Sequence, residues 1–328
     1  MTARLRNHPD DLTALIQQAA DAREIPVSHV EKDFWVTEVL RVASTPREIR
    51  LTDGSMVPVT FTFKGGTSLS RVFGILDRFS EDVDLIAHFP DGASPQARHT
   101  VLKAVDNAVQ EHLGVATEHV EVQSSTVGMK RYTAYPYRVQ ESDRDLKDRV
   151  VLELGSRGGA APSARHQYRS LVADFALTVL GGTTSDWEEF AVFDIITLAP
   201  ERTLLEKLAA VHDAASRLDT ERLLRGGRHF YDIYRLLRDS RVVEALGVLG
   251  EGGIAALAED IDSHSLAGEF SVTPRPPGGY ADSPAFDEAH ECFPSINAGV
   301  EATRGLVYGE TVTMKDVIET VRMNRVLV

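Results

Sequence analysis

The chain has 328 residues, of which 43% are hydrophobic and 26% are charged, a balance typical of a globular protein rather than a disordered one. Its 35 basic and 49 acidic residues give a formal net charge of −14, which argues against a protein that coats nucleic acid nonspecifically. The single Cys292 excludes an intramolecular disulfide, and no apolar run is long enough for a membrane span, so a cytoplasmic protein is expected.

Residue patterns in the first 199 positions alternate between helix and strand. Ser28 and Glu31 have the spacing of a capping box at a helix start. Gly65-Gly66 interrupts an alternating strand. Periodicity predicts helices at Asp10–Arg23, Ser28–Ala43, Thr67–Leu76 and Pro95–Leu113, and strands at Val57–Phe63, Val83–Ala87, Tyr132–Val139, Arg149–Leu154 and Ala191–Leu198.

The remaining sequence is mainly helical in pattern. Pro200 suits the first position of a helix, and Thr273–Gly279 is rich enough in proline and glycine to predict a loop. The expected helices are Glu201–Arg217, Thr220–Asp239 and Val242–Leu257. The prediction is therefore an α+β protein, with a mixed-sheet domain over residues 1–199 and a helical domain over residues 200–328.

A glycine turn carries the first chemical signal. Lys64, Gly65, Gly66, Thr67 and Ser68 end a predicted strand and open a predicted helix. Glycine lets an anion approach the backbone closely, and the free N–H groups at a helix start favour negative charge. The lysine and the two hydroxyls add further donors, so the turn is a candidate phosphate site. An ordinary helix cap is the alternative.

A pair of acids follows on the next predicted strand. Asp82 and Asp84 are two positions apart, so both carboxylates point to the same face. Two adjacent carboxylates repel each other unless a cation lies between them. Mg²⁺ prefers one or two carboxylates together with substrate phosphates. The turn and the acids together predict a site for Mg²⁺, or Mn²⁺ in its place, and the triphosphate of an NTP; a solvated strand end is the alternative.

The same order of a glycine turn and a D-x-D strand resembles the polymerase-β-like nucleotidyltransferase superfamily. That superfamily usually adds a third acid from a neighbouring strand. Glu153, the only acid in the apolar segment Val150–Leu154, is the candidate third metal ligand. An exposed face of an edge strand is the alternative explanation for Glu153. The histidines show no metal-ligand spacing, so no zinc site is expected.

Several spaced motifs also resemble the AbiEii/AbiGii toxin family of bacteria, which includes the MenT toxins. The similarity begins with a segment of the E-K-D-[FY]-W type, continues through the turn and the paired acids, and ends in two helical motifs. The similar segments are Val30–Val36, Phe63–Leu85, Glu153–Gly158, Pro200–Leu208 and Arg228–Tyr234.

The resemblance implies active-site positions for Lys64, Ser80, Asp82, Lys207 and Asp232. The two lysines would neutralise phosphate oxygens. Asp232 would either accept a proton from the attacking hydroxyl or orient Lys207.

Two neighbouring positions complete the implied site. Arg228 would bind a phosphate. The next residue is His229, whereas some family members carry aspartate there, so this chain has no carboxylate for any role at that position.

The family resemblance further implies a toxin that moves NMP from an NTP to the 3′ end of tRNA and so blocks translation. It also implies an antitoxin of the AbiEi/MenA type, which acts without a stable complex or by phosphorylating the toxin. Two alternatives stay open: an enzyme that nucleotidylylates proteins, and an inactive module that binds NTP or antitoxin.

Overall fold

A computed structural model of the chain describes residues 2–78, 80, 82–138, 148–156 and 158–328. These residues form two compact units, each assembled from several stretches of the chain. The first unit comprises Met1–Thr67, Ser80–Ser156 and Ser163–Thr197, and the second comprises Ser68–Phe79, Arg157–Pro162 and Leu198–Val328. The second unit therefore takes two short segments from the sheet-forming part of the sequence. No helix in the described part of the chain combines the length and apolarity needed to cross a membrane.

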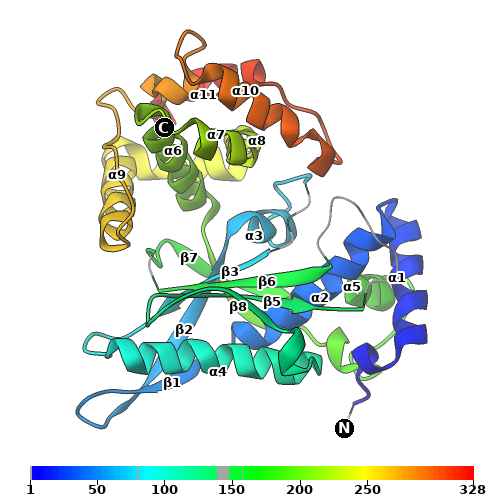
Figure 1. Ribbon diagram of the computed structural model, residues 1–328. Coiled ribbons are helices and arrows are strands. Elements are labelled where there is room, and N and C mark those ends of the chain that lie inside the picture. The colour runs from blue at the N-terminus through cyan, green and yellow to red at the C-terminus, as the bar shows by residue number, and fades with distance from the viewer. Residues whose placement is uncertain (1, 79, 81, 139–147, 157) are drawn as a thin grey trace. The chain divides into compact units, whose positions relative to one another are not determined.

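The first unit is organised around one mixed sheet (Figure 1). In the described residues the strand order is β4-β5-β6-β3-β2-β8-β7, and β1 pairs with the beginning of β2. Strand β3 is antiparallel to β2 and parallel to β6, which itself is antiparallel to β5. The strands are β1 Arg47–Arg50, β2 Met56–Lys64, β3 Asp82–His88, β4 Glu121–Thr126, β5 Lys130–Pro136, β6 Arg149–Gly155, β7 Ser163–Tyr168 and β8 Phe193–Leu198.

One face of this sheet is closed by helices α2 (Val27–Ala43) and α4 (Pro95–Leu113) (Figure 1). Thr133 and Tyr135 of β5 donate hydrogen bonds of 2.7 and 2.8 Å to the carboxylate of Asp106 on α4. On the other strands, the residues that point to this same face are buried and almost entirely apolar. They are Phe61, Phe63, Val83, Leu85, Val150, Leu152 and Leu154. Because successive strand residues alternate in direction, the intervening residues point to the opposite face.

Buried charges on α2 connect this helix to its neighbours. Lys32, with no solvent exposure, donates a 2.6 Å hydrogen bond from Nζ to the carbonyl of Arg149 at the start of β6. Asp33 accepts a 2.6 Å hydrogen bond from the backbone of Leu171, the first residue of α5 (Leu171–Thr178). Helix α1 (Pro9–Arg23) packs against both α2 and α5. The E-K-D-F-W segment therefore has a structural role in the first unit.

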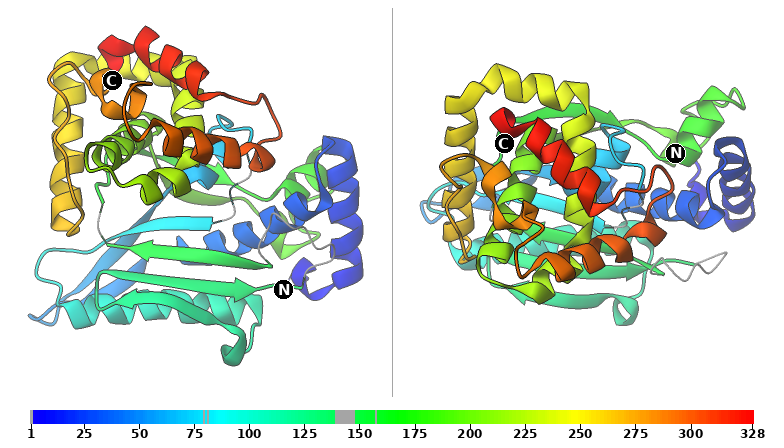
Figure 2. Two further views of the ribbon diagram at one scale, coloured as in Figure 1. Left: turned by 45° about the horizontal axis from the view of Figure 1, so that its top comes forward. Right: turned by 90° about the horizontal axis from the view of Figure 1, so that it is seen from above.

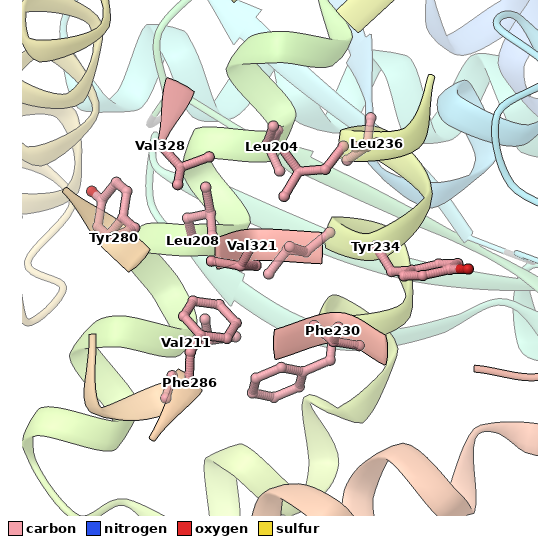
Figure 3. Packing of buried hydrophobic residues seen from close by; sticks show 14 of the residues in the cluster. Leu204, Leu208, Val211, Phe230, Tyr234, Leu236, Tyr280, Phe286, Val321 and Val328 are labelled. Carbon is pink, nitrogen blue, oxygen red and sulfur yellow. The ribbon is translucent and has the colours of Figure 1, made fainter. Parts of the chain in front are cut away.

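The second unit is helical and has its own apolar core (Figure 3). Helix α8 packs against α6, α9, α10 and α11, and Leu69, Ile75 and Leu76 from the early segment complete the same cluster. The helices are α6 Pro200–Ser216, α7 Thr220–Arg225, α8 Gly227–Arg238, α9 Ser240–Ala267, α10 Phe293–Ala302 and α11 Met314–Met323. The short helix α3, Gly65–Arg71, begins in the first unit and ends in the second.

Several predicted boundaries are wrong for identifiable reasons. The expected helix start at Ser28 is wrong: α2 begins at Val27, so Pro26 and not Ser28 is the N-cap residue. The expected helix Thr67–Leu76 is shorter: α3 ends at Arg71.

The predicted helix Thr220–Asp239 is two helices, since the chain turns at Gly226 between α7 and α8. The predicted helix Val242–Leu257 is part of the longer α9, which bends sharply at Gly250, where φ is 63° (Figure 2). Of the predicted strand Tyr132–Val139, the residue Val139 lies outside the described residues. Within the described ranges, three strands and three α-helices were not predicted: β1, β4, β7, α5, α10 and α11.

Candidate active site

A row of polar side chains crosses four adjacent strands of the first unit. Lys64 on β2 pairs with Asp84 on β3, Asp84 pairs with Glu153 on β6, and Glu153 pairs with Tyr132 on β5. Directly paired residues of neighbouring strands point to the same face, so these four side chains share the face opposite α4. All four are partly exposed, whereas the residues beside Lys64, Asp84 and Glu153 that face α4 are buried and apolar: Phe63, Val83, Leu85, Leu152 and Leu154. Asp82, two residues before Asp84, lies on this face too.

The glycine turn and the paired acids meet at the end of β2. Gly65 has a φ of +83°, a conformation that L side chains rarely adopt. A Cβ atom added at Gly65 would collide with Oδ2 of Asp84. The carboxylate of Asp84 therefore lies directly against the backbone of the turn, and only glycine leaves it room.

Substitution of Gly65 by alanine is expected to impair transfer far more than stability. The positive φ costs about 1–2 kcal/mol for any L residue. Displacement of Asp84 by about 1 Å would cost roughly a hundredfold in rate. The matched control is Gly92→Ala, because Gly92 has a φ of +79° but no atom within 4 Å of an added Cβ. Equal losses of kcat in the two variants, measured beside their melting temperatures, would contradict the assigned role of Gly65.

Thr67 ties the turn to the strand that carries the acids. Its hydroxyl donates a 2.6 Å hydrogen bond to the carbonyl oxygen of Asp82, and Oγ of Ser80 lies 3.0 Å from the same hydroxyl. Thr67 is only 1% exposed, and Ser68 is fully buried. The Thr67 hydroxyl thus fixes the start of β3 relative to the turn, which holds Asp82 and Asp84 in position.

The acids of this row fit a divalent cation in part. Asp82 and Asp84 could supply two oxygen ligands from one face, which would suit a Mg²⁺ ion that takes its other ligands from substrate phosphates and water. Among the residues that the structure describes, no three Asp, Glu, His or Cys side chains form a ready metal-binding group. Glu153 is level with Asp84 across the sheet but does not complete a three-ligand cluster with the two aspartates.

The second unit contains a compact cluster around Asp232 of α8. This carboxylate has no solvent exposure and accepts two hydrogen bonds from Arg78, 2.6 Å from Nε and 2.7 Å from Nη2. Lys207 of α6 places its Nζ 2.8 Å from Asp232 Oδ2. Burial alone would raise the pKa of Asp232, but Arg78 and Lys207 lower it far below its ordinary value. Asp232 is therefore ionised and forms ion pairs with both Arg78 and Lys207.

His229 lies beside this cluster and is neutral. Its Nδ1 atom is 3.4 Å from Lys207 Nζ, so the neutral imidazole is positioned to accept a hydrogen bond from the ammonium group. Burial and then the positive charge of Lys207 lower the pKa of His229 from 6.5 to about 3. The neutral imidazole adds no negative charge at this position, so Asp232 and not residue 229 offsets the positive charge of Lys207.

Acidification is expected to destabilise the protein through His229. The folded-state pKa is below the unfolded value, so the unfolded chain binds more protons and stability falls as the pH drops from about 6.5 towards 3. The loss at pH 5 is roughly 2 kcal/mol at most. In the variant His229→Gln this part of the loss of stability should disappear. In the control His264→Gln, which replaces an exposed histidine, the loss should remain. Melting temperatures of the three proteins between pH 7.5 and 5 measure the effect, and identical slopes would contradict it.

The structure groups the predicted residues within each unit. Lys64, Gly65, Gly66 and Thr67 of the turn come together in the first unit with Ser80, the two aspartates and Glu153. Ser68 belongs to the second unit, where Lys207 and Asp232 come together. Arg228 is exposed on α8. Sequence reasoning missed two residues, Arg78 and Tyr132. Arg78 lies in the motif that precedes the acids, and Tyr132 lies in a predicted strand, but their partners Asp232 and Glu153 are known only from the folded chain.

Comparison with models of known protein families identifies the family of the chain. Residues 58–290, more than two-thirds of the chain, match the model of a family described as nucleotidyl transferase AbiEii toxin, type IV TA system. The matched region contains the turn, the paired acids and the cluster around Asp232. No curated protein matches the chain.

Proposed function

The chain belongs to the AbiEii family of nucleotidyl transferase toxins from type IV toxin–antitoxin systems, and from this premise we propose that its acceptor is the 3′ end of tRNA. It is thus a nucleotidyltransferase that uses an NTP. In the proposed reaction the terminal hydroxyl oxygen attacks the α-phosphorus, the bond to the bridging oxygen breaks, and pyrophosphate leaves. The hydroxyl proton passes to solvent. The modified tRNA accepts no amino acid, and translation stops.

The observation that supports nucleotide transfer at this site is the carboxylate of Asp84 against the Gly65 turn, in one strand row with Lys64. The tRNA acceptor follows from the family resemblance alone. A bound Mg²⁺ would offset the charge of the triphosphate during transfer. Asp82 and Asp84 would hold that cation, with Glu153 as the neighbouring acid. The backbone of Gly65 and Gly66 and the ammonium of Lys64 receive the phosphates, because glycine permits close approach and lysine supplies a compact charge.

For the second unit we propose that Lys207 neutralises phosphate oxygens and that Asp232 orients it. A general base must reach the proton that it removes and must have a pKa near the working pH. Asp232 is fully buried, has a strongly lowered pKa and binds Arg78 and Lys207, which favours orientation over proton transfer. Exposed Arg228 is available for a phosphate. Ser80 controls the start of β3 through Thr67.

A mixed sheet followed by helices is compatible with the polymerase-β-like arrangement, which we propose for residues 1–199, with residues 200–328 as the helical domain. Membership in a toxin family implies an antitoxin partner. We propose a partner of the AbiEi/MenA type that acts on the toxin without forming a stable complex, or by phosphorylating it, in the bacterial cytoplasm.

One experiment separates the proposed acceptor from its alternatives. The protein is incubated with total tRNA, cell extract, Mg²⁺ and each α-labelled NTP in turn, and the products are resolved on denaturing gels. Label in tRNA that is lost after removal of its 3′ nucleotides supports the proposal. Label in protein supports the alternative of protein nucleotidylylation, and the absence of transfer with every NTP supports an inactive binding module.

A further inference from the structure

Tyr132 extends the candidate active site to a fourth strand. It pairs directly with Glu153, two strands away from Asp84, and its ring is half-buried on the same face. Lys130 Nζ lies over the ring, 5.3 Å from its centroid. Burial and then the nearby charges of Glu153 and Asp84 raise the pKa of the Tyr132 phenol. The ring is therefore a neutral aromatic surface next to the acids, with the ammonium group of Lys130 over it.

The order of side chains along the row is lysine, aspartate, glutamate, tyrosine: Lys64, Asp84, Glu153 and Tyr132. Neighbouring strands are about 4.8 Å apart, so the row measures roughly 14 Å between its ends. In-line transfer at phosphorus also has a linear order, because the leaving group departs on the side opposite the attacking oxygen. With pyrophosphate at the Lys64 end and the reacting phosphorus at the acids, the attacking hydroxyl arrives from the side of Tyr132.

We propose that Tyr132 is the stacking surface for the terminal nucleoside of the acceptor strand, and that Lys130 contacts its phosphate. This inference rests on the proposed RNA acceptor. Aromatic rings bind single-stranded nucleic acid by stacking on the bases, and adjacent cations add attraction for the backbone. The platform holds the 3′ end so that its hydroxyl faces the phosphorus held by the acids.

The test measures RNA binding without NTP, so that it does not depend on turnover. A fluorescein-labelled RNA with a single-stranded CCA 3′ end is titrated with the wild-type chain and with Tyr132→Ala, Tyr132→Phe and Lys130→Ala. Anisotropy gives the Kd for RNA, and a separate titration with Mg²⁺ and each NTP gives the Kd for nucleotide. Circular dichroism melts verify that each variant is folded.

Tyr132→Ala is expected to weaken RNA binding about tenfold and to leave NTP binding within about twofold. Tyr132→Phe keeps the ring and should bind RNA like the wild type. Lys130→Ala should weaken RNA binding less and flatten its dependence on salt.

Three results would overturn the proposed stacking role of Tyr132. If Tyr132→Ala weakens the binding of NTP instead of RNA, the ring contacts the base of the NTP. If Tyr132→Ala changes neither affinity, or if the wild type does not bind the RNA, Tyr132 is not a stacking surface for RNA. Failure of the proposed function has a different signature, because the labelling experiment would then place the nucleotide on protein, or on nothing.

Discussion

Replacement of Asp84 by asparagine is expected to lower the rate of nucleotide transfer about a thousandfold or more. The substitution keeps the shape of the side chain but removes the charge that a divalent cation requires. Loss of metal binding removes several kcal/mol of transition-state stabilisation, and about 4 kcal/mol corresponds to three orders of magnitude in rate. Asp82→Ala should have a similar effect, because both acids lie on one face of β3.

The matched control is Asp194→Asn, since Asp194 is an exposed aspartate on β8 of the same sheet, paired with Arg165. It should transfer nucleotide at the wild-type rate. Single-turnover rates with an α-labelled NTP measure the effect, and melting temperatures verify folding. Retention of more than a tenth of the wild-type rate in a folded Asp84→Asn protein would refute the metal assignment.

Replacement of Arg78 by methionine is expected to destabilise the second unit by about 3–5 kcal/mol. Methionine fills much of the space of the arginine stem but leaves the fully buried carboxylate of Asp232 with Lys207 alone. Removal of one member of a buried ion pair is costly because the other charge remains without sufficient compensation. Burial alone would lower the pKa of Arg78, yet Asp232 raises it above the ordinary value, which reflects a strong pairing.

Two further variants distinguish charge pairing from general packing. Arg241→Met breaks an exposed pair with Asp239 in the same unit and should cost less than about 1 kcal/mol. The double variant Arg78→Met with Asp232→Asn should recover part of the lost stability, because the uncompensated charge is gone. Urea unfolding followed by circular dichroism gives the three values. Equal costs for Arg78→Met and Arg241→Met would contradict the pairing argument.

Structural features that depend on one short segment could be predicted from the sequence. Helix α4 was predicted with both of its ends correct, because a proline starts it and Gly114, with a φ of 66°, ends it. The turn at Gly65 and the shared face of Asp82 and Asp84 followed from the period of a strand and from the properties of glycine. The family was recognised from the same residues and is confirmed by the match over residues 58–290.

Features that depend on distant partners were not predictable from one sequence. Strand β4, Glu121–Thr126, is polar and mostly exposed, so it lacks the apolar alternation that reveals a strand. The buried pair of Arg78 and Asp232 joins residues 154 positions apart, and no local pattern marks either as a partner of the other. The row from Lys64 to Tyr132 required the order of the strands, which is a property of the whole sheet.

Because each unit is assembled from several stretches of the chain, few recombination points would leave both units intact. The backbone passes from one unit to the other five times, at 67/68, 79/80, 156/157, 162/163 and 197/198. A recombinant that joins two relatives near residue 198 would therefore combine Arg78 from one parent with Asp232 from the other. Leu69 and Leu76 would likewise meet a foreign apolar core. Such hybrids inherit mismatched interiors, so homologues should diverge as whole genes and not as shuffled halves.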